Sequence, residues 1–372
     1  MAHILVSLIS DHSIPNFLII RELPDVDRYL FISTEQMEEK KKTFWLCKSA
    51  NLSPETCMKP IMVQEDSLVD IQDKLSRIEF DDDDRFTVNL TGGTKIMSIG
   101  VYNYFRNRDS RVLYVPIGKN VHRQIFPDIK NRERSIDYRM SVREYVTSYG
   151  LDYAAEPKLD TVRGLEDTAA FYRFHEAMDD TGQQILTTLR SMRKRKKKQT
   201  PLAEIPDVAA WLAGSPFRPA IPNHLLKEEI RYLTGDWFEE SIFFRIRERL
   251  ALPDGAVSHN LQLVRKDVKN EFDIVFTQDN RLHVVECKTA VDDEKRSIVD
   301  DALYKLGALQ KDFGLNPRLT LVTLAQSGTR RIDITDDHRK RAEWMGIAIA
   351  DRNVVQDADP ERLIDVILRR IR

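Results

Sequence analysis

Cysteine is scarce in this 372-residue chain, and long apolar runs are missing. The three cysteines, Cys47, Cys57 and Cys287, form no CxxC pair, so we expect neither a structural zinc site nor a disulfide framework. No apolar stretch approaches the roughly 20 residues that a membrane span requires, and the early segment HILVSLI is too short for a signal peptide. We therefore expect a cytoplasmic protein without a membrane partner.

The chain also lacks a large excess of either charge. It has 57 lysines and arginines against 59 aspartates and glutamates, a net charge of -2. This balance excludes a polycation that binds nucleic acid with its whole surface. The exception is RSMRKRKKK, residues 190–198, with seven basic residues in nine positions. A nucleic-acid contact and a solvated loop remain equally open for this run.

The first 150 residues alternate β-rich runs with charged, amphipathic segments. This alternation predicts a parallel sheet with helices on both faces, as in a Rossmann-like domain. In such sheets, ligands bind beyond the carboxyl ends of the strands. The expected strands are residues 3–9, 28–34, 60–63, 85–91 and 111–117.

The segment VNLTGGTKIMSIG predicts a strand, a tight turn and a helix. Gly92 and Gly93 allow the backbone to turn sharply and to approach a ligand closely. Thr91, Thr94 and Lys95 bring hydroxyl and ammonium donors to the start of the helix, which favours anions. Neither GxGxxG nor a Walker A motif occurs, so ordinary dinucleotide or nucleoside triphosphate binding is not supported. A plain strand–helix turn is an equally good explanation of this segment.

Two further polar loops are expected at the same edge of the sheet. The loop after the first strand, SDHSIPN, carries Ser10, Asp11, His12 and Asn16, and Thr34 follows the second strand. Because the carboxyl ends of parallel strands meet at one edge, these side chains would lie near the Gly-Gly turn. Three polar loops at one edge predict a site for a nucleotide-like ligand.

The rest of the chain divides into two parts. Residues 151–232 are helical and polar, and then rich in proline, which predicts a small helical connector or a winged-helix-like unit. From residue 233 to 372, a helix is followed by the strands EFDIVFT, RLHVVECKT and RLTLVTL, with another helix before the last strand. We expect this part to be a second α/β domain with a core of its own.

The helix GDWFEESIFFRIRERL contains an unexpected carboxylate. Glu239 falls near the centre of the apolar face that Phe238, Ile242 and Ile246 help to form. A carboxylate in an apolar stripe is costly unless it is paired or binds a metal. Glu239 is therefore a candidate for an active site, although a glutamate at a fraying helix start would have the same pattern.

A β-hairpin is expected to bring three more charged groups together. The dipeptide Asp279-Asn280 suits the turn between NEFDIVF and RLHVVECKT. Strand alternation places Glu286 and Lys288 on one face, and the hairpin sets Asp273 beside them.

This charge cluster is suited to phosphodiester hydrolysis. Asp273, Glu286 and the backbone carbonyl of Cys287 are hard oxygen ligands for Mg²⁺ or Mn²⁺. Such a metal would polarise the phosphodiester, and Lys288 would orient or deprotonate a water molecule or offset charge on the phosphate. The ExK tripeptide alone is a weak signal, and an ion-pair network on a hairpin is the alternative explanation.

The N-terminal motifs LVSLISDHSIPN, LTGGTKIMSIGVYNYF and VLYVPIGK resemble the CARF domain, the CRISPR-associated Rossmann-fold sensor of cyclic oligoadenylates. The resemblance covers residues 3 to 150. It implies a homodimer that holds the cyclic messenger across its two-fold axis, with the GGTK turn and the loop after the first strand as binding elements.

Glu239, Asp273, Glu286 and Lys288 together resemble the motif of the PD-(D/E)xK nuclease fold, although Phe272 rather than proline precedes the aspartate. With the CARF-like half, the chain is similar to the CRISPR ancillary nucleases that cyclic tetra-adenylate activates in type III antiviral defence. The resemblance implies a dimeric, metal-dependent endonuclease that cuts DNA, RNA or both.

Three points stay open at the level of sequence. The chain would alternatively be a ligand-responsive regulator that binds nucleic acid without cutting it. A third hypothesis is that the CARF-like domain degrades its own messenger with Ser10, Thr91 or Lys95. Tyr304 and Lys305, on the helix after the ExK strand, support the site or lie on the helix surface.

Overall fold

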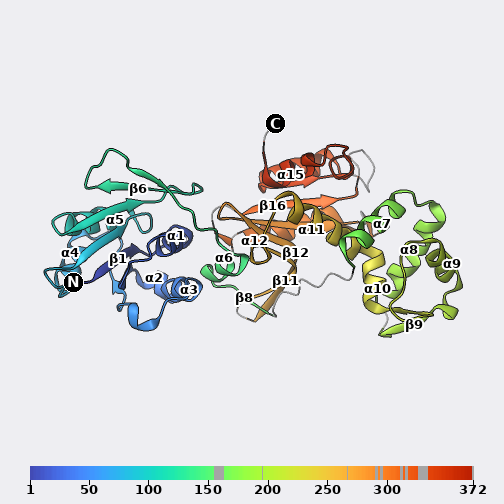
Figure 1. The fold of residues 1–372 in the computed structure, drawn as a ribbon, viewed down its shortest axis with the longest axis horizontal. Helices are drawn as coiled ribbons and strands as arrows, with labels where there is room; N and C mark the ends of the chain where they lie inside the picture. The colour runs from blue at the N-terminus through green and yellow to red at the C-terminus, as the bar shows by residue number, and fades with distance from the viewer. Residues whose placement is uncertain are drawn as a thin grey trace.

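The protein, seen here as a computed structural model, has three parts in a row (Figure 1). An N-terminal α/β domain (blue to cyan) lies at one end, a C-terminal α/β domain (orange and red) lies in the middle, and a helical part (green to yellow) lies at the other end. The expected α/β class is therefore confirmed. The structure describes residues 1–154, 163–194, 196–265, 267–289, 292–293, 296–310, 313–314, 317–325 and 334–370.

The N-terminal domain is built on a seven-stranded sheet of order β3-β2-β1-β4-β5-β6-β7. Strands β1 to β5 run parallel, and β6 and β7 are added antiparallel. The five expected strands thus all form, although β3 is short. The strands are β1 (His3–Leu8), β2 (Arg28–Ser33), β3 (Ile61–Met62), β4 (Arg85–Asn89), β5 (Ser110–Tyr114), β6 (Val121–Phe126) and β7 (Glu133–Ser135).

Helices cover both faces of this sheet because its strands are apolar on both sides. Alternation along β1 sends Ile4 and Val6 to a core shared with α4 and α5, and Leu5 to a second core shared with α1 and α3. These helices are α1 (Ile14–Glu22), α2 (Glu35–Glu39), α3 (Lys42–Ser49), α4 (Leu68–Ser76) and α5 (Lys95–Phe105), with a short 3-10 helix at Pro54–Thr56.

The C-terminal domain has a six-stranded sheet of order β17-β16-β13-β12-β11-β8. In this sheet β8, β11, β12 and β13 pair antiparallel with their neighbours. On the other side of β13, the pairs β13–β16 and β16–β17 are parallel. The strands are β8 (Asp152–Tyr153), β11 (Val257–Arg265), β12 (Val268–Gln278), β13 (Arg281–Lys288), β16 (Arg318–Thr323) and β17 (Ile347–Ala350). The helices are α11 (Trp237–Arg249), α12 (Ile298–Gln310), α13 (Asp336–Trp344), α14 (Arg352–Val355) and α15 (Glu361–Leu368).

The helical part is an insertion into the C-terminal domain. The chain leaves the N-terminal domain through α6 (Val142–Ser148) and enters the C-terminal sheet as β8, which pairs with β11. The helical part lies between β8 and β11 in the sequence. The expected connector between the two α/β domains is therefore displaced to the far end (Figure 1). We call it the helical insertion. It comprises α7 (Leu165–Glu176), α8 (Asp180–Met192), α9 (Pro206–Gly214), α10 (Lys227–Arg231) and a ribbon of β9 (Gln199–Pro201) and β10 (His224–Leu226).

Two continuous apolar cores join the three parts. One core runs from Leu5 and Phe17 of the N-terminal domain through Tyr145 of α6 to Val284 and Phe313 of the C-terminal domain. The other joins the insertion to α11 and the opposite face of the C-terminal sheet. A shared core of this kind resists sliding between parts, because any displacement would open voids. No described helix combines the length and apolar composition that a membrane crossing demands.

Candidate functional sites

The Gly-Gly turn lies against the end of β1, at the carboxyl edge of the N-terminal sheet. A side chain at Gly92 would overlap the carbonyl oxygen of Leu8, and it would lie 3.4 Å from the hydroxyl oxygen of Ser10. Gly93 has a φ of +70°, in the left-handed region that glycine tolerates best. The two predicted loops, after β1 and after β4, therefore lie side by side.

The start of α5 is open to solvent beside this turn. Thr94 caps the helix by accepting a hydrogen bond from the amide of Met97 at 3.1 Å, and its hydroxyl donates to the carbonyl of Glu65 at 2.6 Å. Lys95 is exposed. The free amides of the first turn and the Lys95 ammonium leave this point favourable to an anion.

Three of the predicted side chains point into the protein. The Asn16 amide donates to the carbonyl of Leu8 at 2.8 Å and accepts from Asn89 at 2.8 Å. The Thr91 hydroxyl donates to Asn89 at 2.6 Å and accepts from the amide of Val115 at 2.8 Å. Thr34 caps α2. The side chains of Asn16, Thr34 and Thr91 therefore hold the loops in shape, and other residues of these loops form the exposed surface.

Asp11 and His12 lie in a charged surround. The Asp11 carboxylate pairs with Lys40 at 3.1 Å and Lys42 at 3.6 Å. Burial alone would raise the pKa of Asp11, but the two ammonium groups outweigh it and lower that pKa. Burial also lowers the pKa of His12, which is therefore neutral near pH 7. The His12 Nδ1 atom is buried and has no hydrogen-bond partner among the described residues.

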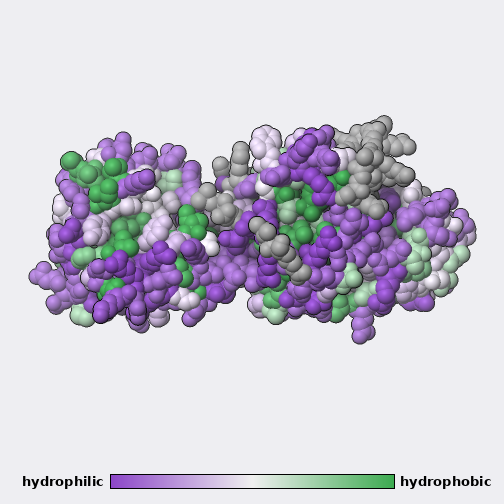
Figure 2. Space-filling model, turned by 90° about the horizontal axis from the view of Figure 1, so that it is seen from above, coloured by the Kyte–Doolittle hydropathy of each residue, from purple (hydrophilic) through white to green (hydrophobic). Residues whose placement is uncertain are grey.

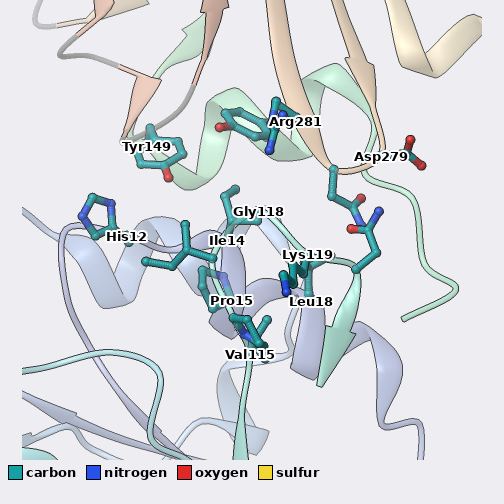
Figure 3. Close-up of a pocket in the computed structure, with 15 residues that line it drawn as sticks. His12, Ile14, Pro15, Leu18, Val115, Gly118, Lys119, Tyr149, Asp279 and Arg281 are labelled. Atoms are coloured by element: carbon teal, nitrogen blue, oxygen red, sulfur yellow. The ribbon is translucent and has the colours of Figure 1, made fainter. Parts of the chain in front are cut away.

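His12 lines a pocket between the two α/β domains (Figure 3). Its cavity volume is about 70 Å³, which is smaller than the usual volume of a small-molecule site. Tyr149 and Arg281 face it from the C-terminal side, and Gly118 and Lys119 face it from the loop after β5 (Figure 3). The carboxyl edge of the N-terminal sheet is therefore continuous with the domain junction.

The C-terminal candidate site is set by a hairpin. Asp279 and Asn280 both have positive φ values, 51° and 59°, as a two-residue type I′ turn requires. Backbone pairing between β12 and β13 runs from the Gln278–Arg281 pair to the Ile274–Val285 pair. At the next position the Asp273 carboxylate accepts the amide of Cys287 at 2.7 Å. The hairpin prediction is confirmed. Beyond the last backbone pair, the Asp273 carboxylate accepts the hydrogen bond of the Cys287 amide in place of a backbone carbonyl.

Glu286 and Lys288 point the same way from β13, as strand alternation requires. The Lys288 ammonium lies 2.6 Å from Glu286 Oε1 and 3.5 Å from Asp273 Oδ2. The Lys305 ammonium of α12 lies 2.7 Å from the other oxygen of Glu286. Of Tyr304 and Lys305, it is therefore Lys305 that belongs to the cluster. Tyr304 is 54% exposed and lies on the helix surface.

The pKa shifts show strong crowding of negative charge. Burial and the neighbouring Glu286 raise the pKa of Asp273 to about 6. Burial, Asp273 and Asp236 raise the pKa of Glu239 well above its usual value, which places Glu239 in the same cluster. Burial opposes the charge on Lys288, but the carboxylates of Asp273 and Glu286 outweigh burial and raise its pKa, so Lys288 is an ammonium ion.

The side chains of Cys287 and Glu240 lie next to the cluster in sequence but are buried outside it. The Cys287 thiol is buried in the apolar core behind the strand, so only its backbone faces the cluster side. Glu240, rather than Glu239, is the most deeply buried carboxylate of α11, and it accepts a hydrogen bond from Thr168 of the insertion at 3.2 Å.

Sequence patterns did not identify all of the charged residues at the two sites. Asp236 precedes α11 in a π-helical turn, Tyr232–Asp236, and no apolar periodicity marked it. Lys42 and Lys119 come from segments far from the Gly-Gly turn in sequence, and only the fold brings them to the same edge. The VPIGK motif, which Lys119 ends, was the one available signal.

The cluster fits a hard divalent cation by its donor chemistry. Within the described part of the chain, no three histidine, cysteine, aspartate or glutamate side chains are drawn together as a ready-made metal site. The Lys288 ammonium instead lies between the carboxylates of Asp273 and Glu286. Buried carboxylates with raised pKa values are relieved by a cation, and oxygen donors suit Mg²⁺ or Mn²⁺.

Comparison with known proteins agrees with this division of the chain. Residues 4–145 match the family model of the Card1 CARF domain, and residues 226–353 match that of the Card1-like endonuclease domain. No curated protein sequence matches the chain.

Three solved structures share the fold over nearly the whole chain. Can2 from Sulfobacillus thermosulfidooxidans, in complex with cyclic tetra-adenylate, has a TM-score of 0.74 at 18% identity, covering 98% of this chain and 99% of its own. Protein VC1899 from Vibrio cholerae has a TM-score of 0.69 at 18% identity, covering 99% and 96%. A type III CRISPR defence DNA nuclease activated by cyclic oligoadenylate has a TM-score of 0.59 at 16% identity, covering 100% of this chain but 52% of its own.

At these identities the structural likeness establishes the fold alone. The fold and the two sites define a Rossmann-type sensor domain joined to a nuclease-type α/β domain. The two matching family models, which together span most of the chain, place it among the CRISPR-associated CARF-domain nucleases, with a Card1-type CARF domain and a Card1-like endonuclease domain.

Proposed function

We propose that the protein is a metal-dependent endonuclease of the PD-(D/E)xK type, that it cuts DNA, RNA or both, and that cyclic tetra-adenylate bound by a CARF homodimer activates it. One observation carries the proposal. The buried cluster of Asp273, Glu286 and Lys288 lies at the open end of the β12–β13 hairpin, whose turn at Asn280 contacts the CARF domain.

The cluster supplies the chemistry. A bound Mg²⁺ or Mn²⁺ would polarise the scissile phosphodiester, and Asp273, Glu286 and the Cys287 carbonyl would hold it. Without a cation, the carboxylates of Asp273 and Glu286 raise the pKa of Lys288 and keep it an ammonium ion. Beside a bound metal, Lys288 would orient or deprotonate the water molecule or offset negative charge on the phosphate. Lys305 fixes the orientation of Glu286 through its bond to Oε2.

The messenger site would lie at the carboxyl edge of the CARF sheet. Four features favour a multiply charged anion there: the Gly-Gly turn, the open start of α5, and the ammonium groups of Lys95 and Lys119. The complex of Can2 with cyclic tetra-adenylate, a structure with the same fold, supports this choice of ligand. His12, with its unpaired buried nitrogen, is the side chain best placed to read a nucleotide group at the pocket.

A second copy of the chain would complete the messenger site. The CARF domain exposes large apolar side chains on α5, β5 and β6, including Ile99 at 48% and Ile125 at 46%. Figure 2 shows apolar patches over this domain as well as over the C-terminal domain. Exposed apolar area of this kind favours burial against another protein surface, here the CARF domain of a partner.

The hairpin provides a path for activation. The Asn280 side chain accepts from the amide of Met140 at 2.8 Å and donates to Asn120 and Tyr138, each at 2.9 Å. A rearrangement of the loop after β5 would therefore act directly on the hairpin turn, and the two paired strands would transmit it toward Asp273 and Glu286. The messenger favours the arrangement in which the cluster admits substrate.

The test is a cleavage assay that crosses four substrates, single- and double-stranded DNA and RNA, with several cyclic oligoadenylates and with Mg²⁺ or Mn²⁺. We expect cleavage that requires both a metal and cyclic tetra-adenylate. Messenger-dependent binding without any cleavage would overturn the proposal in favour of a nucleic-acid-binding regulator.

A further inference from the structure

The end of α8 lies beside the nuclease cluster, although the two are far apart in sequence. A side chain at Gly235 would lie 3.7 Å from the Arg193 guanidinium and 3.8 Å from the hydroxyl of Thr289. Thr289 follows Lys288 directly, and its hydroxyl donates to the carbonyl of Thr234 at 3.4 Å. The first basic residues of the run at 190–198 are thus brought to the carboxyl end of β13.

Arg193 and Arg231 share a single carboxylate partner. Asp236 Oδ1 lies 3.9 Å from Arg193, and Asp236 Oδ2 lies 3.6 Å from Arg231. The Asp236 side chain is 12% exposed, whereas those of Arg193 and Arg231 are 40% and 48% exposed. Asp236 is therefore fixed inside the protein, and both guanidinium groups keep much of their surface toward solvent.

The arginine side chains around Asp236 outnumber the carboxylate that they contact. Arg190, one turn before Arg193 on α8, makes no ion pair with any acidic side chain in the part of the chain that the structure describes. Burial and the neighbouring Arg193 lower the pKa of Arg190, which shows how closely the cations are crowded. Arg193 and Arg231 together carry two positive charges and share the single carboxylate of Asp236, so their exposed guanidinium groups can still bind a further anion.

The anion that the proposed function brings to this place is a nucleic-acid phosphate. Asp236 raises the pKa of Glu239, so the arginine pair and the nuclease cluster are electrostatic neighbours. Guanidinium groups bind phosphate oxygens through two parallel hydrogen bonds and stay charged at every working pH. The exposed Lys194 and Lys196 to Lys198 continue the positive surface from Arg193 along the insertion.

We propose that Arg193 and Arg231 form a phosphate-binding subsite that holds the nucleic-acid backbone beside the scissile bond, and that Asp236 is the positioning residue for both. The inference rests on the proposed nuclease function and extends it. It gives the helical insertion a role in substrate binding, and it assigns the basic run, left open by the sequence, to the nucleic-acid contact.

The test measures binding separately from cleavage. Full-length protein carrying Glu286→Gln, with cyclic tetra-adenylate present, is titrated with labelled single- and double-stranded DNA and RNA over a series of salt concentrations. We expect Arg193→Ala and Arg231→Ala each to reduce the slope of log affinity against log salt by about one. Affinity falls to a similar extent for all sequences, because phosphate contacts carry no sequence information.

Arg249→Ala is the matched control. Arg249 is 47% exposed, pairs with Glu361 at 3.4 Å and lies at the other end of α11, so its loss should leave the salt slope unchanged. A further set of variants excludes a purely structural role for the arginines. If the two arginines only neutralised the buried charge of Asp236, they would have no role once Asp236→Asn has removed that charge. We expect instead that adding Arg193→Ala and Arg231→Ala to the Asp236→Asn protein still weakens nucleic-acid binding by at least about tenfold.

The outcomes distinguish the subsite from the function. If the unmodified protein cuts nucleic acid but the arginine variants keep both affinity and salt slope, the subsite is refuted while the nuclease stands. If the Asp236→Asn background removes all effect of the arginines, their role is structural and the subsite is refuted. A parent protein that neither binds nor cuts nucleic acid would overturn both proposals.

Discussion

The CARF domain and the endonuclease domain use buried polar groups in opposite ways. In the CARF domain, Asn16, Thr34 and Thr91 have their hydrogen-bonding capacity met by the loops that they shape. In the endonuclease domain, Glu239 and Asp273 are crowded with other carboxylates, and their pKa values are raised. The first arrangement stabilises the fold, whereas the second costs stability.

This difference separates a recognition surface from a reactive centre. At the carboxyl edge of the CARF sheet, backbone amides and small side chains keep the loops in a preformed shape that can bind a ligand. This arrangement has no electrostatic cost. A cluster of buried carboxylates persists only because the surrounding structure holds it in place, which is typical of catalytic sites. The two regions should therefore respond differently to substitution.

The largest effect should come from the nuclease cluster. Glu286→Gln removes the charge that Lys288 and Lys305 both contact, and we expect cleavage to fall by at least about 1,000-fold. Messenger affinity should not change, because the substitution lies outside the CARF domain. Glu248→Gln, an exposed position near the far end of α11, serves as the control. Full cleavage by the Glu286 variant would disprove the assignment of the site.

A change at the Gly-Gly turn should affect the other region. In Gly92→Ala the new methyl group would overlap the Leu8 carbonyl, so we expect a loss of about 3 kcal/mol in the free energy of unfolding and weaker messenger binding. Gly214→Ala, with no atom within 4 Å of the added carbon, should change stability by less than about 1 kcal/mol. Denaturant unfolding and calorimetric titration would measure both effects, and equal behaviour of the two variants would contradict the close approach of the loops.

The junction between the regions gives a third test. Asn280→Gly keeps the positive φ but removes the three hydrogen bonds to Asn120, Tyr138 and Met140. The ratio of cleavage with and without messenger should fall by about fivefold or more. Asn223→Gly, at an exposed asparagine that also has a positive φ, is the control. An unchanged ratio would show that activation does not pass through the hairpin turn.

The last effect has the opposite sign, since it is a gain in stability that depends on pH. The pKa of Asp273 is raised from 3.8 to about 6 by folding, so ionisation of this group opposes the folded state. Its contribution to stability is highest below its unfolded pKa and is lost as the pH rises through about 6. Asp273→Asn should therefore raise the free energy of unfolding by about 1 to 3 kcal/mol at about pH 8, and by less at about pH 4.

Thermal unfolding in a chelator would measure this gain, and adding Mn²⁺ should raise the melting temperature of the unmodified protein only. A variant that is less stable than its parent at the higher pH would contradict the crowding of charge.

Local sequence patterns predicted the elements better than the sites. Strand alternation and the Asp279-Asn280 turn correctly predicted the hairpin, because both are set by neighbouring residues. Alternation also predicted that Glu286 and Lys288 point together. The inward turn of Asn16 depends on its partner Asn89, 73 residues away, and the place of Arg193 depends on how the insertion packs on α11. Contacts over such distances leave no periodic signal in the chain.

In the proposed mechanism the CARF domain gates the endonuclease domain. The most direct measurement follows cleavage of one labelled substrate in Mn²⁺ while cyclic tetra-adenylate is titrated, with messenger binding recorded on the same sample. We expect little cleavage without messenger, and cleavage that rises in parallel with occupancy of the CARF site. Strong cleavage in the absence of messenger, or none at saturation, would contradict this mechanism.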